Sequence, residues 1–164
     1  MKSLPKNPLN AIAASLLITA AAIVPGVAQA DTKVTHFGPT GVPQMAGLGK
    51  TPPFSASVLA GDTLYIAGTT DGDPATGKPA ADATAGATKV LDNIKHTVEA
   101  AGLKMDDLVW VQVFASNLAD YGAFNDVYRT YFKGPMPARA FIGAGSLLGG
   151  AHFEVMGIAV KPSK

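Results

Sequence analysis

Strand-like and helix-like patterns alternate between residues 54 and 160, and this alternation constrains the fold more than any other feature of the sequence. Side chains that alternate with a period of two predict strands, and apolar residues with a period near 3.6 predict helices. The expected elements are a short edge strand at 33–37, strands at 54–59, 63–69 and 108–115, helices at 82–101 and 120–133, and two C-terminal strands within 134–144 and 151–160. Gly61-Asp62 lies between two of these strands and predicts a hairpin turn.

Both helical segments have well-defined ends. Asp82 can cap the first helix, and Gly102 can adopt the left-handed conformation that ends it. Gly134-Pro135 predicts the end of the second helix. The residues expected on the buried faces are Ala87, Leu91, Ile94, Val98 and Ala101 in the first helix, and Phe124, Val127 or Tyr128, and Tyr131 in the second.

The order of the elements predicts an α+β fold. A strand–helix–strand–helix–strand succession implies parallel neighbours joined by right-handed crossovers. Together with the hairpin and the last strand, this predicts a six-stranded mixed sheet with both helices on one face. The other face would carry Val, Phe, Met and Ile side chains without a cover, so we expect another subunit to bury it.

The first 30 residues predict a secretory signal peptide. Lys2 and Lys6 precede an apolar run at 9–24, and Ala28-Gln29-Ala30 is a small-x-small cleavage site. A retained membrane anchor is the alternative, but the run is shorter than the roughly 20 residues that span a bilayer. We therefore expect cleavage after Ala30, one domain at 31–164, a periplasmic or secreted location, and no membrane association after cleavage.

Composition excludes several classes of function. The chain has 13 Lys and Arg against 12 Asp and Glu, and Lys2 and Lys6 lie in the predicted signal peptide. No basic patch with interleaved aromatic residues remains, so we expect no nucleic-acid partner. Cysteine is absent, which excludes disulfides and a thiol nucleophile.

Short motifs for phosphate or metal binding are also absent. Residues 72–79 nearly match a phosphate-binding loop, but Pro79 stands where Ser or Thr must hold magnesium, so we interpret the segment as a turn. The three histidines, His36, His96 and His152, lack the spacing of metal ligands, although His152 could line a pocket. The sequence thus predicts neither a metal nor a cofactor.

Two charged residues interrupt the apolar C-terminal strands. Arg139 begins the first strand and Glu154 lies inside the second, and such residues are rarely buried without a partner. Alternation along each strand separates an apolar face suited to a helical layer from a face that presents the charge. Arg139, Phe141 and Gly143 share one face, and His152 shares a face with Glu154. We take the charged faces as the candidate functional surface.

Arg139 has two interpretations. It could form a structural salt bridge with Glu154 or another acid. It could also bind a ligand carboxylate, because a guanidinium presents paired donors that match two carboxylate oxygens. The preceding proline-rich turn, with Pro137, would hold it on a rigid base. Glu154 would then orient a water or carry a proton, and Asn125 is either an exposed helix residue or a ligand contact.

Several motifs carry a resemblance to a known family. They are DPATG at 73–77, VLDNI at 90–94, EAAGL at 99–103, FNDVY at 124–128, PARAFI at 137–142 and FEV at 153–155. From Phe54 onward the chain resembles the RidA/YjgF family of enamine/imine deaminases. The resemblance implies a chorismate-mutase-like fold and a homotrimer with three clefts between subunits. It also implies that the strand at 109–115 lies between the two C-terminal strands, so a site uniting Arg139 and Glu154 draws on two chains.

The implied activity is hydrolysis of 2-imino acids, formed from enamines such as 2-aminoacrylate, to 2-keto acids and ammonia. By resemblance, Arg139 holds the substrate carboxylate, and the backbone at Phe141 contacts the imine or the water. Glu154 positions or activates that water, and Asn125 lines the cleft. Because the reaction also proceeds in water, positioning and modest acid–base help would suffice without a cofactor.

Two positions depart from the family pattern within the expected substrate-binding region, which comprises Phe54, Ala67 and Gly68. Phe54 stands where deaminases usually have tyrosine, and Ala67 stands where they have serine before the glycine. Each lost hydroxyl contact could cost about 1.5–3 kcal/mol. The alternatives are an exported trimeric protein that binds small carboxylates without turnover, and a structural or holdase-like trimer.

Overall fold

The computed structural model describes residues 32–38 and 52–163, which belong to one compact unit, Asp31–Lys164. The predicted signal peptide lies outside the described residues, so the cleavage site and the periplasmic or secreted location stay predictions. The elements are β1 (Val34–Phe37), β2 (Ser57–Ala60), β3 (Thr63–Thr70), α1 (Ala83–Ala100), η1 (Met105–Asp107), β4 (Leu108–Ala115), η2 (Leu118–Asp120), α2 (Tyr121–Arg129), β5 (Ala138–Gly143), η3 (Leu148–Gly150) and β6 (Phe153–Val160).

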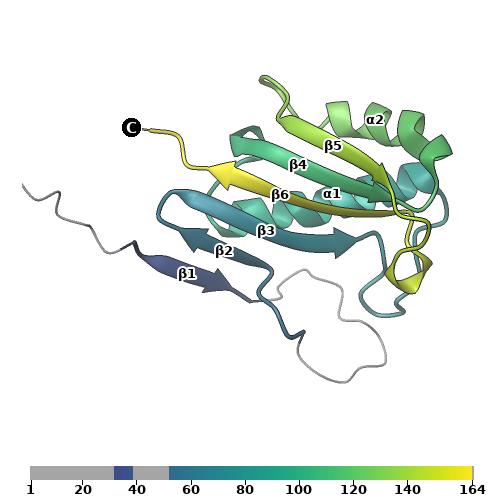
Figure 1. Cartoon of the computed structure of the whole chain (residues 1–164), viewed down its shortest axis with the longest axis horizontal. Coiled ribbons are helices and arrows are strands. Elements are labelled where there is room, and N and C mark those ends of the chain that lie inside the picture. The colour runs from purple at the N-terminus through teal and green to yellow at the C-terminus, as the bar shows by residue number, and fades with distance from the viewer. Residues whose placement is uncertain (1–31, 39–51, 164) are drawn as a thin grey trace, which may run out of the picture. The chain divides into compact units, whose positions relative to one another are not determined.

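The strands form one six-stranded mixed sheet in the order β1-β2-β3-β6-β4-β5 (Figure 1). Only β4 and β5 pair in parallel, and the other neighbours are antiparallel. The predicted hairpin is confirmed, with Gly61 at φ 60° in the turn between β2 and β3. The expectation that β4 separates the two C-terminal strands is also confirmed. The prediction of parallel neighbours joined by a helix is confirmed for β4 and β5 but wrong for β3 and β4, because β6 lies between them.

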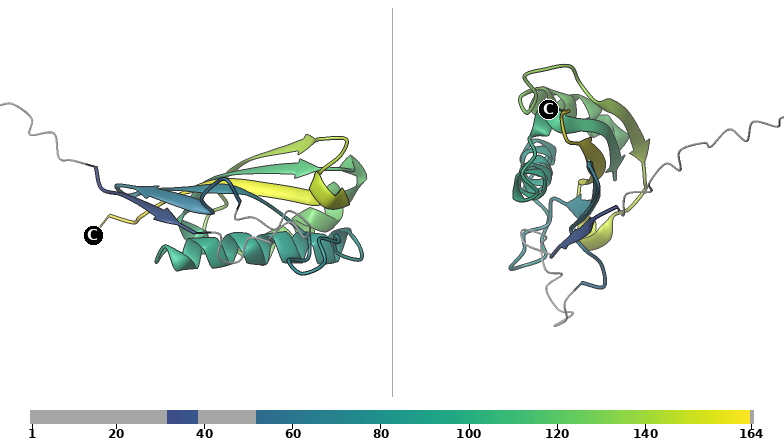
Figure 2. Two further views of the ribbon diagram at one scale, coloured as in Figure 1. Left: turned by 90° about the horizontal axis from the view of Figure 1, so that it is seen from below. Right: turned by 90° about the vertical axis from the view of Figure 1, so that its left-hand side faces the viewer.

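Both helices cover the same face of the sheet, as predicted (Figure 2). The Asp82 side chain accepts a hydrogen bond from the Ala85 N–H at the start of α1, and Gly102 follows the helix at φ 78°. The second helix ends at Arg129, earlier than the predicted 133. The reason is tertiary: the N–H groups of Lys133 and Gly134 donate to Asp106 Oδ1 instead of continuing the helix.

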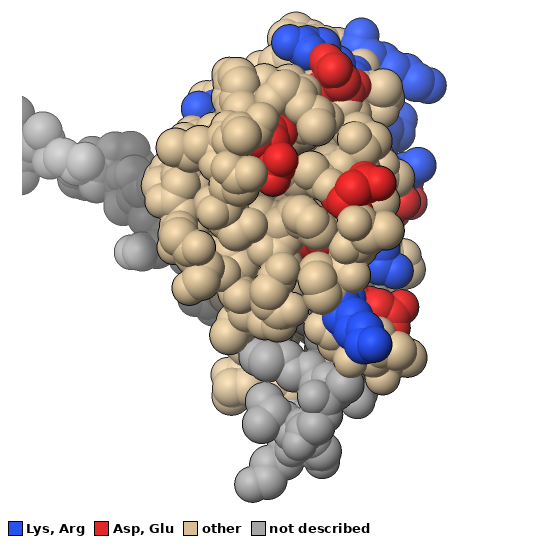
Figure 3. Space-filling view, turned by 90° about the vertical axis from the view of Figure 1, so that its right-hand side faces the viewer, with Lys and Arg blue, Asp and Glu red and all other residues tan. Residues whose placement is uncertain are grey.

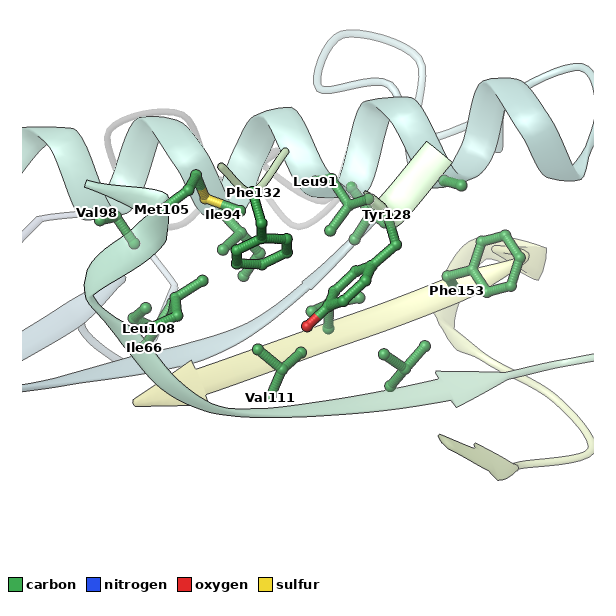
Figure 4. Close-up of a cluster of buried hydrophobic side chains, with 14 of the residues drawn as sticks. Ile66, Leu91, Ile94, Val98, Met105, Leu108, Val111, Tyr128, Phe132 and Phe153 are labelled. Carbon is green, nitrogen blue, oxygen red and sulfur yellow. The ribbon is translucent and has the colours of Figure 1, made fainter. Parts of the chain in front are cut away.

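The hydrophobic core lies between the helices and the sheet. Leu64, Val113, Phe124 and Phe153 are almost completely buried there. Figure 4 shows how Leu91, Ile94 and Val98 of α1 face Tyr128, Phe132, Val111 and Phe153 across this layer. Four of the five apolar residues predicted on the inner face of the first helix are buried, and Ala101 is half-buried. For the second helix the structure selects Tyr128 over Val127 as the more deeply buried residue.

The opposite face of the sheet has no covering element among the described residues (Figure 2). Its paired positions carry large side chains: Tyr65, Trp110, Phe114, Met156 and Ile158. Charged side chains gather along one side of the surface in Figure 3, and the rest of that view is mostly uncharged. None of the helices in the described ranges is long and apolar enough to cross a membrane. Burial of the uncovered face by another subunit remains a prediction.

Candidate functional site

The Arg139 side chain lies beneath α2, where one helix face supplies most of its contacts. Its Nη2 atom donates to Asn125 Oδ1 at 2.6 Å. Its Cζ atom lies 4.6 Å from the centroid of the Tyr128 ring and 5.8 Å from those of Phe124 and Phe141. Asn125 and Tyr128 are three residues apart, a spacing that places both on the same side of a helix. The guanidinium is therefore fixed by one hydrogen bond and by cation–π contact.

This placement corrects the expectation that the charged face of each C-terminal strand is the face without helices. Arg139 pairs with Val111 and Phe141 pairs with Val113, both buried positions beneath the helices. Glu154 pairs with Phe114 and lies on the uncovered face, as expected. Alternation in β5 could not decide the matter, because each face carries one large apolar residue, Phe141 on one and Ile142 on the other, and β5 is an edge strand. Contacts of Phe141 with Phe124 and Phe153 decide it.

Arg139 forms no ion pair with any acid of the described ranges, so the salt-bridge interpretation has no support within the chain. Asn125 accepts only one of the guanidinium's five N–H bonds, and Arg139 is half-buried rather than enclosed. The remaining donors are suited to bind a carboxylate in the paired geometry that arginine favours. The arrangement can therefore hold an anionic ligand at the edge of the sheet.

Tyr128 is a functional candidate that the sequence pattern did not single out. Burial raises the pKa of its hydroxyl to about 12, while the nearby Arg139 charge opposes the rise. The ring thus stays neutral and supports the guanidinium through its face rather than through a charge. Its spacing of three from Asn125 is the signal that would have suggested a shared role.

The Glu154 carboxylate lies directly over Gly68. A Cβ atom added to Gly68 would overlap Glu154 Oε1 and would approach Cδ to 3.2 Å. Gly68 falls in the bulge of β3, where the register with β6 shifts between Ile66 and Thr69. The neighbouring Ala67 uses its N–H to bond the Ala56 carbonyl. The absence of a side chain at position 68 is therefore what lets the carboxylate occupy this place.

Within one chain the predicted residues thus form two separate groups. The first comprises Arg139, Asn125 and Phe141, and the second comprises Glu154, Gly68 and Ala67. The groups lie on opposite faces, and β4 separates their strands by two spacings, roughly 9–10 Å. Phe54 is largely exposed before β2. None of these residues lines the open groove of about 650 Å³ between α1 and α2.

Comparison with known proteins bears on the chain's relationships. The family described as Endoribonuclease L-PSP matches residues 47–161. The 2-iminobutanoate/2-iminopropanoate deaminase of Dermatophagoides farinae is 36% identical over 112 residues, which are 66% of this chain and 85% of that protein. The crystal structure of the YjgF gene product from E. coli has a TM-score of 0.68 and 31% identity, covering 78% of this chain and 99% of that one. E. coli TdcF with bound serine has a TM-score of 0.69 and 27% identity, covering 78% and 99%.

Proposed function

Because the chain belongs to the RidA/YjgF family, we propose that it hydrolyses reactive 2-imino acids, formed from enamines, to 2-keto acids and ammonia. Relatives that are about a third identical are named as deaminases of 2-iminobutanoate and 2-iminopropanoate. The substrate is thus a small molecule with a carboxylate next to a C=N bond.

The observation that carries the proposal is the state of Arg139. The guanidinium is held in place by an amide and an aromatic ring, and neither contact neutralises its charge. A 2-imino acid supplies the missing carboxylate. Binding the carboxylate at Arg139 fixes the adjacent C2 atom near the backbone of Phe141, two residues along β5. Such positioning lowers the entropic part of the barrier to attack by water.

In the proposed reaction, Glu154 accepts a hydrogen bond from the attacking water and aligns it with C2. The water oxygen bonds to C2 while one water proton passes to Glu154, the C=N π electrons move to nitrogen, and the nitrogen takes up that proton to give a carbinolamine. A proton then moves from the hydroxyl to the nitrogen, the C–N bond breaks, and ammonia leaves as the C=O bond forms. Glu154 would carry this proton as a general acid–base.

We propose that the complete site lies between two copies of the chain. Arg139 and Glu154 lie on opposite faces of one sheet, and this separation supports a cleft to which one copy contributes Arg139 and another contributes Glu154. The uncovered face around Ile158 supplies an apolar surface for such contacts. A homotrimer would repeat the cleft three times.

The two departures from the family pattern set an expectation for rate. Phe54 and Ala67 cannot donate the hydroxyl hydrogen bonds expected at these positions, at a cost of about 1.5–3 kcal/mol for each lost contact to a charged or reacting group. The carboxylate-binding residues are all present. We therefore expect substrate binding to be conserved better than turnover.

The test uses purified mature protein and an amino-acid oxidase that generates the imino acid. We expect faster release of keto acid and ammonia than in the oxidase reaction alone. Arg139→Ala should reduce kcat/KM by roughly 10- to 100-fold, because charged hydrogen bonds contribute about 1.5–3 kcal/mol. Arg139→Lys keeps the charge but loses the paired N–H donors, so its kcat/KM should lie between those of the wild type and Arg139→Ala.

The matched control is Arg129→Ala. Arg129 is also an arginine close to Asn125 and Tyr128 in sequence, since it is the last residue of α2, but it is exposed and pairs with Asp126 of the same helix. Unchanged release of keto acid in Arg139→Ala, with Arg129→Ala also unchanged, would contradict the proposal.

A second candidate is an exported trimeric protein that binds small carboxylates without turnover. The serine bound to E. coli TdcF, a structural relative, and the two absent hydroxyls favour considering it. Calorimetric binding of a 2-keto acid that depends on Arg139, without any rate effect, would support the binder. If the protein shows neither binding nor turnover, a structural or holdase-like trimer is the better description.

A further inference from the structure

Asp71 is a buried acid that the proposed chemistry does not use. Its side chain is 1% exposed. It accepts hydrogen bonds from the backbone N–H groups of His152 at 2.8 Å, Phe153 at 3.1 Å and Ala80 at 3.2 Å. Its Oδ2 atom also lies 2.9 Å from His152 Nδ1. Burial of a carboxylate is unfavourable unless hydrogen-bond donors surround it. The four groups that converge on Asp71 therefore indicate a specific structural role for this side chain.

These contacts join two strand ends immediately beside Glu154. Asp71 follows Thr70, which is the register partner of Glu154 across β3 and β6. Phe153, the first residue of β6, directly precedes Glu154, and His152 lies just before the strand. One carboxylate thus ties the end of β3 to the start of β6 within a residue of the proposed water-positioning group.

Asp71 lies just after the bulge in β3, and this position gives its contacts with His152 and Phe153 a specific structural role. The β3–β6 register shifts between Ile66 and Thr69, so pairing on one side of the bulge does not determine pairing on the other. Because β6 is also held in register by β4, a slip of one residue at the end of β3 would leave Glu154 on its own face but would move Gly68 away from the Glu154 carboxylate. Asp71 is the side chain that bonds across this junction, and Gly68, on which the Glu154 carboxylate rests, lies inside the bulge.

His152 completes the arrangement from the other side. Its Nδ1 lies within hydrogen-bond distance of Asp71 Oδ2 and can donate to that carboxylate. The side chain is one-quarter exposed. Gly86 of α1 lets the helix approach, because a Cβ there would lie 3.0 Å from Asp71 Oδ2 and 3.3 Å from His152 Cβ. The pair is therefore held between the helix and the two strand ends.

We propose that Asp71 and His152 form a positioning pair that sets the register of the end of β3 against β6 after the bulge and thereby keeps Gly68 beneath the Glu154 carboxylate. The inference rests on the proposed function for its catalytic consequence. The structural consequence, which concerns the backbone of Gly68 and Phe153, does not depend on the proposed function. Arg139 belongs to the other group of residues, so the pair should influence turnover rather than carboxylate binding.

The test compares four variants of the mature protein. Asp71→Asn keeps the shape but replaces Oδ2, which accepts the Ala80 N–H, with an N–H₂ group that cannot accept it. His152→Gln retains a side-chain donor for Asp71, and His152→Leu removes it. Asp73→Asn is the matched control, because Asp73 accepts N–H bonds from Ala75 and Thr76 in its own loop and does not contact β6.

Two measurements are made on each variant: the amide NMR resonances of Gly68 and Phe153, and kcat and KM for the imino acid. In Asp71→Asn and His152→Leu we expect both resonances to shift and kcat to fall about tenfold or more, with KM changed less than about twofold. His152→Gln and Asp73→Asn should retain the wild-type kcat within about threefold and the wild-type Gly68 resonance.

Wild-type resonances and kcat in Asp71→Asn would overturn the inference. It would also be overturned by a His152→Gln variant that loses as much kcat as His152→Leu while the Gly68 resonance stays unchanged, because the ring itself would then be required. If the wild-type protein does not accelerate imine hydrolysis, the proposed function fails, and the NMR readout alone decides whether Asp71 and His152 set the register.

Discussion

Tyr128 stacks against Arg139 while its own hydroxyl is buried without a hydrogen-bond partner among the described residues. Figure 4 shows this hydroxyl directed toward Val111 of β4, in an apolar layer. A buried unpaired hydroxyl costs about 1–3 kcal/mol. The ring, in contrast, contributes both to the core and to the support of the guanidinium. The two parts of this side chain therefore have opposite effects on stability.

Tyr128→Phe should separate these effects. It keeps the ring, so Arg139-dependent binding of a 2-keto acid should be unchanged. Removal of the unpaired hydroxyl should raise the unfolding free energy at pH 7 by about 1 kcal/mol. Urea unfolding and calorimetric binding measure the two quantities. A lower stability in Tyr128→Phe would show that the hydroxyl has a favourable partner.

The same variant has an expected pH dependence. Burial raises the pKa of Tyr128 from 10.0 in the unfolded chain to about 12 in the folded one. Between these values the unfolded state has lost the proton that the native state keeps, so stability falls as pH rises. Tyr128→Phe should flatten this fall. The unfolding free energy of Tyr128→Phe should still fall somewhat with pH, because burial and the hydrogen bond to Asp92 raise the pKa of Tyr131 as well.

At the scale of elements, helix α1 depends on a cap that is visible in the sequence. Asp82 Oδ1 accepts the Ala85 N–H at 2.9 Å, which satisfies one of the free donors in the first turn. The buried face of α1 then contributes Leu91, Ile94 and Val98 to the core. The cap and the apolar face specify the same helix.

Asp82→Ala should lower the unfolding free energy by about 1 kcal/mol, because the cap is lost while the packed face remains. Asp82→Ser is the control, since serine can accept the same hydrogen bond. Denaturant midpoints with unchanged slopes measure the difference. Equal stability of Asp82→Ala and the wild type would indicate that tertiary packing alone determines the start of α1.

The strand ends are less visible in the sequence than the ends of α1. The bulge in β3 shifts the register with β6, and the contacts of Asp71 lie beyond it. A bulge interrupts the alternation of side chains along a strand, so the pattern at 63–69 predicted the strand but not its pairing with β6. Pairing depends on groups from residue 152 onward, far along the chain.

At the scale of the whole molecule, the uncovered face of the sheet remains to be explained. Tyr65 and Trp110 both pair with Ile158 at its centre, and Tyr65 is half-exposed in the single chain. Apolar surfaces of this kind mark association sites in soluble proteins. A further copy of the chain would bury this face and would also bring a second set of site residues into reach.

Ile158→Glu tests this role. A charge buried at the centre of an interface costs several kcal/mol, so we expect assembly to weaken roughly 100-fold or more. Light scattering after size exclusion should show a monomer where the wild type shows an oligomer, and turnover should be lost with assembly. Lys95→Glu is the control, because Lys95 is an exposed residue of α1, on the other side of the sheet. An Ile158→Glu protein with the wild-type mass would contradict burial of this face.

The sequence by itself determined the elements, both ends of α1, the hairpin, the family resemblance and most of the core. These features depend on residues close together in the chain, where spacing and local chemistry are sufficient. It also identified Asn125 and Phe141 beside Arg139 as residues of interest. The structure brings these three together, while their functional roles remain proposals.

Only the tertiary structure decided which face of β5 carries Arg139, which acid is buried beside Glu154, and which strand separates β3 from β4. Each depends on contacts between residues far apart in sequence, such as Phe141 with Phe124 and Asp71 with His152. Alternation divides a strand into two faces, but it does not say which face a helix will cover. That choice is made when the helices pack, because burial of the larger apolar area and satisfaction of buried polar groups must be achieved at once.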